Sequence, residues 1–386
     1  MKDISYIINH LGEEREKYSN AITPPLFQTS NFAFKDVDEL KRAIADERNS
    51  LIYSRGNNPT VDILCKKIAA LEDTEEALAF ASGMAAISAA IISFVDNGDH
   101  IISVRNNYSW TNMLMTRFLP RFGVETTFVD GRDPVNFKRA LRKNTRIIYL
   151  ESPNSLTFEL QDIEAVAAIA KEAGITTLID NSYSSPLTQS PANMGIDIIL
   201  HSASKYLGGH SDIVAGMVCG SSENILRIFK NEYLGLGGII SPFNAWLMLR
   251  GLRTLQARID RISATTTKVV EYLENHPLIT DVLHPLSARH PQYNLAVKQM
   301  LNPTGLFSVR LATTDKSKIE QFVNSLRQFI IGVSWGGHES LVFPALSFDD
   351  QRTAEGYSNN LVRFYIGLDE PESLISDLDQ AFRKII

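Results

Sequence analysis

Five short apolar runs, separated by segments long enough to form helices, constrain the fold of this chain more than any other feature. They lie at residues 76–80, 100–104, 124–129, 146–150 and 175–179. Strands and helices that alternate at this spacing are typical of βαβ units, which place helices on both faces of a mostly parallel sheet. Ligands of such sheets bind at the carboxyl ends of the strands, so the residues directly after each run are candidates for a site.

The segments outside this alternation divide the chain into three parts. Pro24 and Pro25 interrupt any long periodic segment near the N-terminus, which indicates an arm rather than a domain. From Pro242 towards Tyr272, apolar residues recur at helical spacing and predict a long helix that leads into a smaller α/β unit. We expect an arm over residues 1–52, a large domain over 53–250 and a small C-terminal domain over 251–386.

Local patterns predict further elements within these parts. Asp36, followed three residues later by Glu39, forms a capping box for a helix with three apolar residues on one face, Val37, Leu40 and Ile44. Thr60, directly after Pro59, is expected to cap the next helix. In the small unit, strands are predicted at 306–311 and 361–366, before a last helix with one apolar face formed by Leu374, Leu378 and Phe382.

Composition excludes several classes of protein. The 386 residues contain 44% hydrophobic and 21% charged side chains, which argues for a folded chain, and 44 acidic against 38 basic residues give a net charge of -6. Because this field repels polyanions, nucleic acid is not expected as a partner. The uncharged stretch 77–95 is rich in Ala, Ser and Gly, so a buried strand and helix are expected there rather than a membrane span.

The cysteines and histidines do not predict a disulfide framework or a metal site. Cys65 and Cys219 are far apart and have no ligand partners at metal-binding spacing. Four histidines without a second ligand nearby are interpreted as structural or solvent-facing: His10, His100, His201 and His210. Since the first residues also lack the pattern of an export signal, we expect a protein of the reducing cytoplasm, without a metal.

The densest group of chemically active residues is HSASKYLGGHSD at 201–212, which follows the apolar run 197–200. Lys205 is therefore expected at the carboxyl end of a strand, where desolvation or nearby positive charge can supply the neutral amine that forms a Schiff base. Ser202 and Ser204 could donate hydrogen bonds to an anion. The alternative is an ordinary surface lysine on a polar loop.

Two other strand ends add to this prediction. Asp180 closes the run ITTLI, and a carboxylate there could keep a pyridine nitrogen protonated, as pyridoxal chemistry requires. The alternative role for Asp180 is a helix cap or turn. SGMAAI at 82–87 opens a helix, where the backbone amides of Gly83 and Met84 could bind a phosphate. A dinucleotide site is the competing explanation, but the turn lacks the G-x-G-x-x-G spacing.

Taken together, the chain resembles the trans-sulfuration family of pyridoxal-phosphate enzymes, which act in cysteine and methionine metabolism. Five motifs occur in the order typical of that family: YSRGNNPT at 53–60, SGMAAI at 82–87, DNSYSSP at 180–186, HSASKYLGGHSD at 201–212 and SWGGHESL at 334–341. The resemblance implies fold type I, with a large domain around a mostly parallel seven-stranded sheet and a smaller C-terminal α/β domain. It also implies pyridoxal 5'-phosphate as the cofactor.

The resemblance assigns expected roles around the cofactor. Lys205 would carry it and act as the catalytic base, and Asp180 would pair with its ring nitrogen. The phosphate would be bound by Ser202, Ser204, Gly83 and Met84. Tyr53 and Arg55 of the YSR motif would reach the active site of a neighbouring subunit, which implies a homodimer at least and, as is usual in the family, a homotetramer.

Further positions match residues that contact cofactor or substrate in the family. Tyr108 would stack on the cofactor ring and help to deprotonate the incoming amine. Arg363 would bind the substrate α-carboxylate, a bidentate contact that suits a guanidinium. The substrate pocket would be completed by Ser334, Trp335, Tyr53 and Ser155.

Departures from the common motifs suggest one branch of the family. Trp110 stands in a loop where many γ-acting members have glycine or cysteine, and Ser155 stands where they carry asparagine. Both resemble the enterobacterial type of cystathionine β-lyase, so we expect β-elimination of L-cystathionine to homocysteine, pyruvate and ammonia. The alternatives are a γ-acting synthase or lyase and, more remotely, a paralogue without catalysis.

Overall fold

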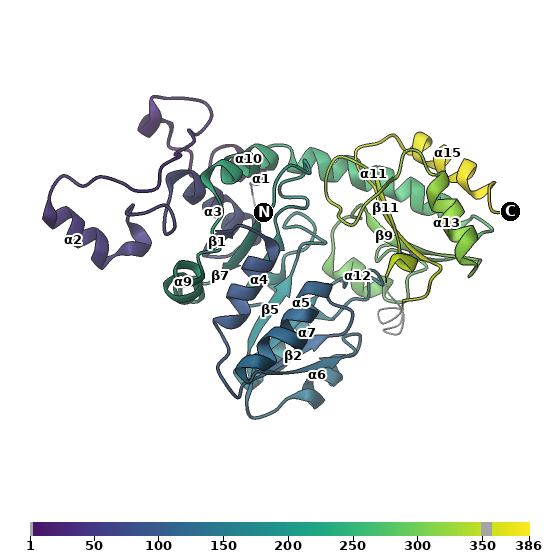
Figure 1. Ribbon diagram of the computed structural model, residues 1–386, viewed down its shortest axis with the longest axis horizontal. Coiled ribbons are helices and arrows are strands. Elements are labelled where there is room, and N and C mark those ends of the chain that lie inside the picture. The colour runs from purple at the N-terminus through teal and green to yellow at the C-terminus, as the bar shows by residue number, and fades with distance from the viewer. Residues whose placement is uncertain (1–2, 349–356) are drawn as a thin grey trace.

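A seven-stranded sheet forms the centre of the larger part of the protein. The structure is a computed structural model that describes residues 3–348 and 357–386 (Figure 1). The strands are ordered β1-β7-β6-β5-β4-β2-β3. Their bounds are β1 Glu76–Phe80, β2 His100–Val104, β3 Glu125–Val129, β4 Thr145–Glu151, β5 Thr176–Asp180, β6 Ile198–Ser202 and β7 Gly216–Gly220. All neighbouring strands are parallel except β7, which is antiparallel to both β1 and β6. The predicted mostly parallel sheet is confirmed.

Both faces of this sheet are buried, which explains why its strands are continuous apolar runs. Along β1, Ala77 and Ala79 join a core with α3, α7 and α10, whereas Leu78 and Phe80 join a second core with α4 and α8. The helices around the sheet are α3 Pro59–Glu72, α4 Gly83–Ile92, α5 Ser109–Met113, α6 Pro134–Ala140, α7 Ile163–Ala173, α8 Ser222–Ile228, α9 Leu234–Leu236 and α10 Pro242–Leu252. The uncharged stretch 77–95 is therefore a buried strand and helix, as predicted.

A second, five-stranded sheet forms the smaller part, in the order β10-β11-β12-β9-β8. Its strands are β8 Ile279–Leu283, β9 Leu306–Leu311, β10 Ile330–Ile331, β11 Leu341–Pro344 and β12 Leu361–Tyr365. The helices of this part are α11 Leu255–Glu274, α12 Tyr293–Gln299, α13 Lys316–Ser325 and α15 Pro371–Phe382. Apolar side chains of α11, α13 and α15 join those of the sheet in one core. Figure 1 shows these three helices beside the strands of this part. This confirms the smaller α/β unit, while the boundary at residue 250 stays a prediction.

Two local predictions are wrong. The helical stretch from Pro242 is two helices, α10 and α11, rather than one. At the break, the buried Arg258 donates from Nη2 to the Gly251 carbonyl and from Nε to Thr254 Oγ1, so its guanidinium satisfies groups that a continuous helix would pair internally. The cap of α3 is Asn58, whose side chain accepts from the Thr60 amide, because Pro59 occupies the first helical position.

The N-terminal residues form an arm with little core of its own. It contains α1 Ile4–Asn9 and α2 Val37–Ala45, and Figure 1 shows α2 on a segment that projects away from both sheets. Asp36 caps α2 as predicted, accepting from the Glu39 amide. On the apolar face of α2, Val37 and Ile44 are 65% and 62% exposed. Among the residues that the structure describes, none covers these two side chains.

No helix in the described ranges is both long enough and apolar enough to cross a bilayer.

Candidate active site

The ends of three adjacent strands bring together residues that are far apart in the sequence. Glu151 is the last residue of β4, Asp180 of β5 and Ser202 of β6. In the sheet register Glu151 lies beside Asp180, which in turn lies beside Leu200 of β6. The carboxyl edge of the large sheet therefore carries the predicted Asp180 and Ser202 together, along with a second carboxyl group that the sequence analysis did not assign.

Lys205 follows β6 and contacts the second sheet's part of the chain. Its Nζ donates a hydrogen bond to Ser334 Oγ at 2.6 Å and lies 5.3 Å from the centre of the Trp335 ring. Burial, and secondarily the charge of Arg363, lower the pKa of Lys205 to about 8, although Asp180 acts in the opposite direction. A sizeable fraction of the amine is therefore neutral near physiological pH, as Schiff-base chemistry requires.

The loop that carries Ser334 approaches the lysine very closely. Gly336 has φ +91°, and a Cβ on it would lie 2.7 Å from Lys205 Cα, so only glycine fits without displacement of the backbone. Tyr365 of β12 fixes the same loop by donating from its hydroxyl to the Gly337 carbonyl at 2.8 Å. The contact between Lys205 and Ser334 thus depends on a glycine and on the second sheet.

The guanidinium of Arg363 lies in the same region and could bind an anion. It lies on β12 opposite Phe343 and donates from Nη2 to the Val333 carbonyl at 2.8 Å. Burial lowers its pKa to about 10, and among the described residues no carboxylate forms an ion pair with it. A half-buried guanidinium without an acidic partner is suited to bind a carboxylate from a ligand.

Asp180 is buried and is held by its own turn. Its Oδ1 accepts from the Ser182 amide at 2.9 Å. Burial raises the pKa of Asp180, while the hydrogen bonds from Ser182 and the charges of His201 and Lys205 oppose this shift. The Asp180 carboxyl group can therefore pair with a positively charged ring nitrogen. The charge of that nitrogen would stabilise the ionised form of Asp180.

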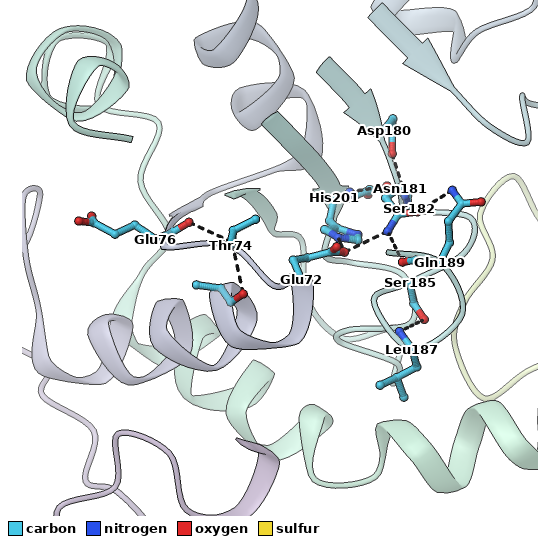
Figure 2. Close-up of polar contacts among 12 residues, drawn as sticks. Glu72, Thr74, Glu76, Asp180, Asn181, Ser182, Ser185, Leu187, Gln189 and His201 are labelled. Atoms are coloured by element: carbon cyan, nitrogen blue, oxygen red, sulfur yellow. Dashed lines mark hydrogen bonds and ion pairs between the residues drawn. The ribbon is translucent and has the colours of Figure 1, made fainter. Parts of the chain in front are cut away.

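A buried polar network lies behind Asp180 (Figure 2). Glu72 Oε1 is 2.5 Å from His201 Nε2 and accepts a hydrogen bond from Asn181 Nδ2 at 3.0 Å. Gln189 Nε2 then donates to Asn181 Oδ1 at 3.1 Å. His201 is thus structural, one of the two roles predicted for it. The sequence does not reveal its pairing, because Glu72 lies 129 residues earlier.

The turn before α4 has the features of an anion site. The Ser82 side chain caps the helix by accepting from the Ala85 amide, and the amides of Gly83 and Met84 occupy the first turn, where no preceding turn supplies an acceptor. A Cβ on Gly83 would lie 3.0 Å from Ser202 Cα, so the glycine lets this turn pack directly against the end of β6. The start of α4 and Ser202 therefore lie together, while their contact with a phosphate stays a prediction.

The Ser204 hydroxyl is already engaged within the chain. It donates to the Ala215 carbonyl at 3.3 Å and accepts from the Ala215 amide at 3.0 Å. Its contact with a phosphate stays a prediction.

Tyr108 and Ser155 meet at Glu151. The Tyr108 backbone amide donates to Glu151 Oε2 at 2.6 Å, and the Ser155 hydroxyl donates to Glu151 Oε1 at 2.7 Å. The Tyr108 side chain is 40% exposed, and burial, together with Asp180 and Glu151, raises the pKa of its phenol. Glu151 was not predicted as a site residue, although it lies directly at the end of an apolar run.

Tyr53 and Arg55 lie apart from this group. Both are exposed, and the Arg55 guanidinium lies 5.9 Å from the centre of the Tyr53 ring. Across the two described ranges, no hydrogen bond or ion pair joins either side chain to Lys205, Asp180 or Arg363. Within one chain they do not complete the site.

Comparison with known proteins identifies the family. A family model described as Cys/Met metabolism PLP-dependent enzyme matches residues 6–383. The chain belongs to this family. Its cofactor is accordingly pyridoxal 5'-phosphate, and its fold is the fold type I of these enzymes.

Individual relatives match over nearly the full chain. An L-methionine gamma-lyase of Treponema denticola is 38% identical, covering 98% of this chain and 96% of that protein. A cystathionine gamma-lyase of Bacillus subtilis is 35% identical, covering 97% and 98% respectively. The crystal structure of metB from Corynebacterium glutamicum superposes with a TM-score of 0.93 at 33% identity, covering 100% of this chain and 99% of that one. These names favour the γ-acting alternative over the expected β-lyase.

The residues present fit the cofactor of the family. Lys205 has an amine of lowered pKa, Asp180 is a buried carboxylate for the ring nitrogen, and the first amides of α4 are available to a phosphate. The close packing of Gly83 against Ser202 places the start of α4 next to the strand that leads to the lysine.

Proposed function

We propose that this protein is a carbon–sulfur lyase of sulfur amino acids that eliminates at the γ-carbon. The observation that carries the proposal is the hydrogen bond from Lys205 Nζ to Ser334. At this position the charges of both Arg363 and Asp180 act on the lysine amine and shift its pKa. A base, a carboxylate-binding cation and a ring-nitrogen partner are the three groups that α-proton removal from an amino acid needs. The γ assignment draws support from the lyases of Treponema denticola and Bacillus subtilis.

Each of these groups has a definite task in the proposed reaction. Bound pyridoxal phosphate supplies a ring that withdraws the electrons left at the α-carbon when its proton is removed. Arg363 binds the substrate α-carboxylate, and Tyr108 helps to deprotonate the incoming amine. Lys205 then removes the α-proton and afterwards a proton from the β-carbon, so that the carbon–sulfur bond at the γ-carbon can break, and the thiol leaves with a proton that Lys205 returns. Asp180 stays ionised opposite the ring nitrogen throughout.

The remaining predicted contacts complete the proposed site. Gly83, Met84, Ser202 and Ser204 bind the phosphate, and the substrate pocket is completed by Ser334, Trp335, Ser155 and a partner's copy of Tyr53.

Elimination at the β-carbon is the second candidate. Its support is the pair Trp110 and Ser155, which depart from the γ-acting motifs. The Ser155 hydroxyl is directed to Glu151, where a longer asparagine side chain would have a different reach.

The 2-keto acid released from L-cystathionine by the purified protein, identified by mass, separates the two candidates. We expect 2-oxobutyrate with cysteine and ammonia, after consumption of one water, and 2-oxobutyrate with methanethiol when L-methionine is the substrate. Pyruvate with homocysteine would instead establish β-elimination. If neither acid forms while added cofactor binds, the lyase assignment is wrong and acyl-homoserine substrates should be tested with cysteine.

We further propose that the active site is completed by a second copy of the chain. Support comes from the exposed Tyr53 and Arg55 and from the arm, where α2 leaves Val37 and Ile44 uncovered. Apolar faces of this kind are buried in obligate dimers. Contact of Tyr53 and Arg55 with the neighbouring phosphate requires a homodimer, and two such dimers would form the tetramer usual in the family.

Mixing two inactive variants tests this sharing of sites. Lys205→Ala and Arg55→Ala chains are co-refolded in equal amounts, and the keto acid is measured. If Arg55 acts across the interface, half of the dimers are hybrids with one intact site, so roughly one quarter of wild-type activity returns. Each variant refolded alone is the control. Activity no higher than the mean of those controls would show that Arg55 acts in its own chain or not at all.

A further inference from the structure

Glu151 connects three parts of the site through one buried carboxyl group. Its two oxygens contact the Tyr108 amide and the Ser155 hydroxyl, and its strand places it beside Asp180. The Tyr108 contact is made by the backbone amide, 43 residues away in sequence, so it fixes the loop that carries the ring. The place of Tyr108 in the site therefore depends on an acceptor at residue 151.

The loop after Glu151 has an unusual backbone that needs such an anchor. Leu156 and Phe158 have φ angles of 65° and 54°. This left-handed backbone conformation costs free energy for residues other than glycine. Both side chains are buried, and the Ser155 contact to Glu151 lies directly before them. The tertiary structure thus imposes this loop shape and, with it, the place of Ser155.

Two buried, adjacent carboxyl groups cannot both carry a negative charge without strong repulsion. Asp180 has the charges of His201 and Lys205 in its favour, whereas the hydrogen bonds to Glu151 come from neutral groups. Burial, followed by repulsion from Asp180, raises the pKa of Glu151 to about 8. The other titratable groups facing the pair are the phenols of Tyr108 and Tyr149, whose pKa values are raised mainly by burial.

We propose that Glu151 is a positioning residue that stays protonated at neutral pH, so that it anchors the Tyr108 loop while Asp180 keeps the single negative charge of the pair. In this state the Tyr108 amide still donates to Glu151 Oε2, whereas the proton on Oε1 reverses the bond with Ser155, so that Glu151 donates to a hydroxyl from which it otherwise accepts. The inference rests on the proposed function of the site only in that pyridoxal phosphate binds there. It holds for either direction of elimination.

The protonated carboxyl group is tested directly by infrared spectroscopy of the protein without substrate. We expect the carbonyl band of a buried carboxylic acid at pH 7, its loss as the pH rises through about 8, and its absence from Glu151→Gln at every pH. A wild-type protein without this band at pH 7, or a Glu151→Gln variant that retains it, would overturn the proposal.

Positioning is tested by the affinity for pyridoxal phosphate, measured by equilibrium dialysis at pH 7. In Glu151→Gln the amide still accepts from Tyr108 and donates to Ser155, so the dissociation constant stays within about threefold of wild type. In Glu151→Ala the Tyr108 amide loses its acceptor, and we expect weakening of about tenfold, the size of one hydrogen bond. The matched control is Glu159→Ala, a carboxylate on the same loop that contacts Asn154 instead.

The outcomes separate a positioning role from a charged or merely structural one. Equal weakening in Glu151→Gln and Glu151→Ala would mean that the negative charge is needed, and wild-type affinity in a folded Glu151→Ala would mean that the anchor is dispensable. Either result overturns the proposal. Should Glu151→Ala fail to fold, the infrared band and Glu151→Gln still decide. Since no sulfur amino acid is present, an error in the proposed reaction would leave these readouts unchanged.

Discussion

Lys205→Ala is expected to abolish keto-acid release while the protein still binds pyridoxal phosphate. Loss of a general base alone lowers turnover by about 10²–10⁴-fold, and Lys205 is also the proposed point of covalent attachment, so the decrease should reach the upper end of that range or exceed it. Asp180 and the first amides of α4 remain and retain the cofactor without a covalent bond. Activity is measured as 2-keto acid at saturating cofactor, and binding by equilibrium dialysis.

Lys205→Arg separates the role of the amine from that of its charge. The guanidinium keeps a cation beside Ser334 and Trp335 but does not deprotonate, so we expect it to be as inactive as alanine. Lys268→Ala on the exposed surface of α11 is the control for loss of a lysine and should leave activity unchanged. If Lys205→Ala turned over within tenfold of wild type, Lys205 would not be the base and the proposed mechanism would be wrong.

Asp180→Asn is expected to have the second-largest effect. The neutral amide cannot stabilise a proton on the ring nitrogen, so the ring withdraws electrons less effectively and turnover should fall by about 10²-fold or more. Loss of a hydrogen bond between charged groups, worth about 1.5–3 kcal/mol, should weaken cofactor binding by about 10- to 100-fold. Dialysis gives the affinity, and keto-acid release at saturating cofactor gives the remaining turnover.

Asp197→Asn is the matched control for this variant. Asp197 lies before the start of β6, away from the carboxyl edge, and accepts hydrogen bonds from the Thr177 amide and hydroxyl. It should lower stability without changing cofactor affinity. Wild-type affinity and turnover in Asp180→Asn would show that Asp180 does not act on the cofactor. Its role would then be that of a turn residue, which accepts a hydrogen bond from the Ser182 amide.

The sequence predicts the large sheet well because burial on both faces makes its strands continuous apolar runs. All five runs of the alternating pattern are strands, as are the two runs assigned to the small unit. Strand β7 was missed because it begins with Gly216 and ends with Gly220, and glycine is depleted in strands. The break after α10 was missed because the apolar spacing continues across it, and the Gly251 carbonyl is satisfied by the side chain of Arg258, seven residues later, which no apolar pattern reveals.

For the site, residues at strand ends were predictable and their pairings were not. The positions of Asp180 and Lys205 follow from local patterns, since each comes at or after an apolar run. Glu151 was overlooked although it has the same position, because its importance comes from neighbours on other strands and loops. The pair of Glu72 and His201 likewise has no local signal.

The contact between Lys205 and Ser334 also determines when the protein can first function during its synthesis. Asp180, Lys205 and the α4 turn all belong to the first sheet's part of the chain, whereas Ser334 and Arg363 are translated 129 and 158 residues after the lysine. At about 5–20 residues per second, this corresponds to several seconds or more on the ribosome. A nascent chain would thus form the proposed cofactor-binding edge before the proposed carboxylate-binding arginine, so that turnover could begin only after the second sheet's part has been made.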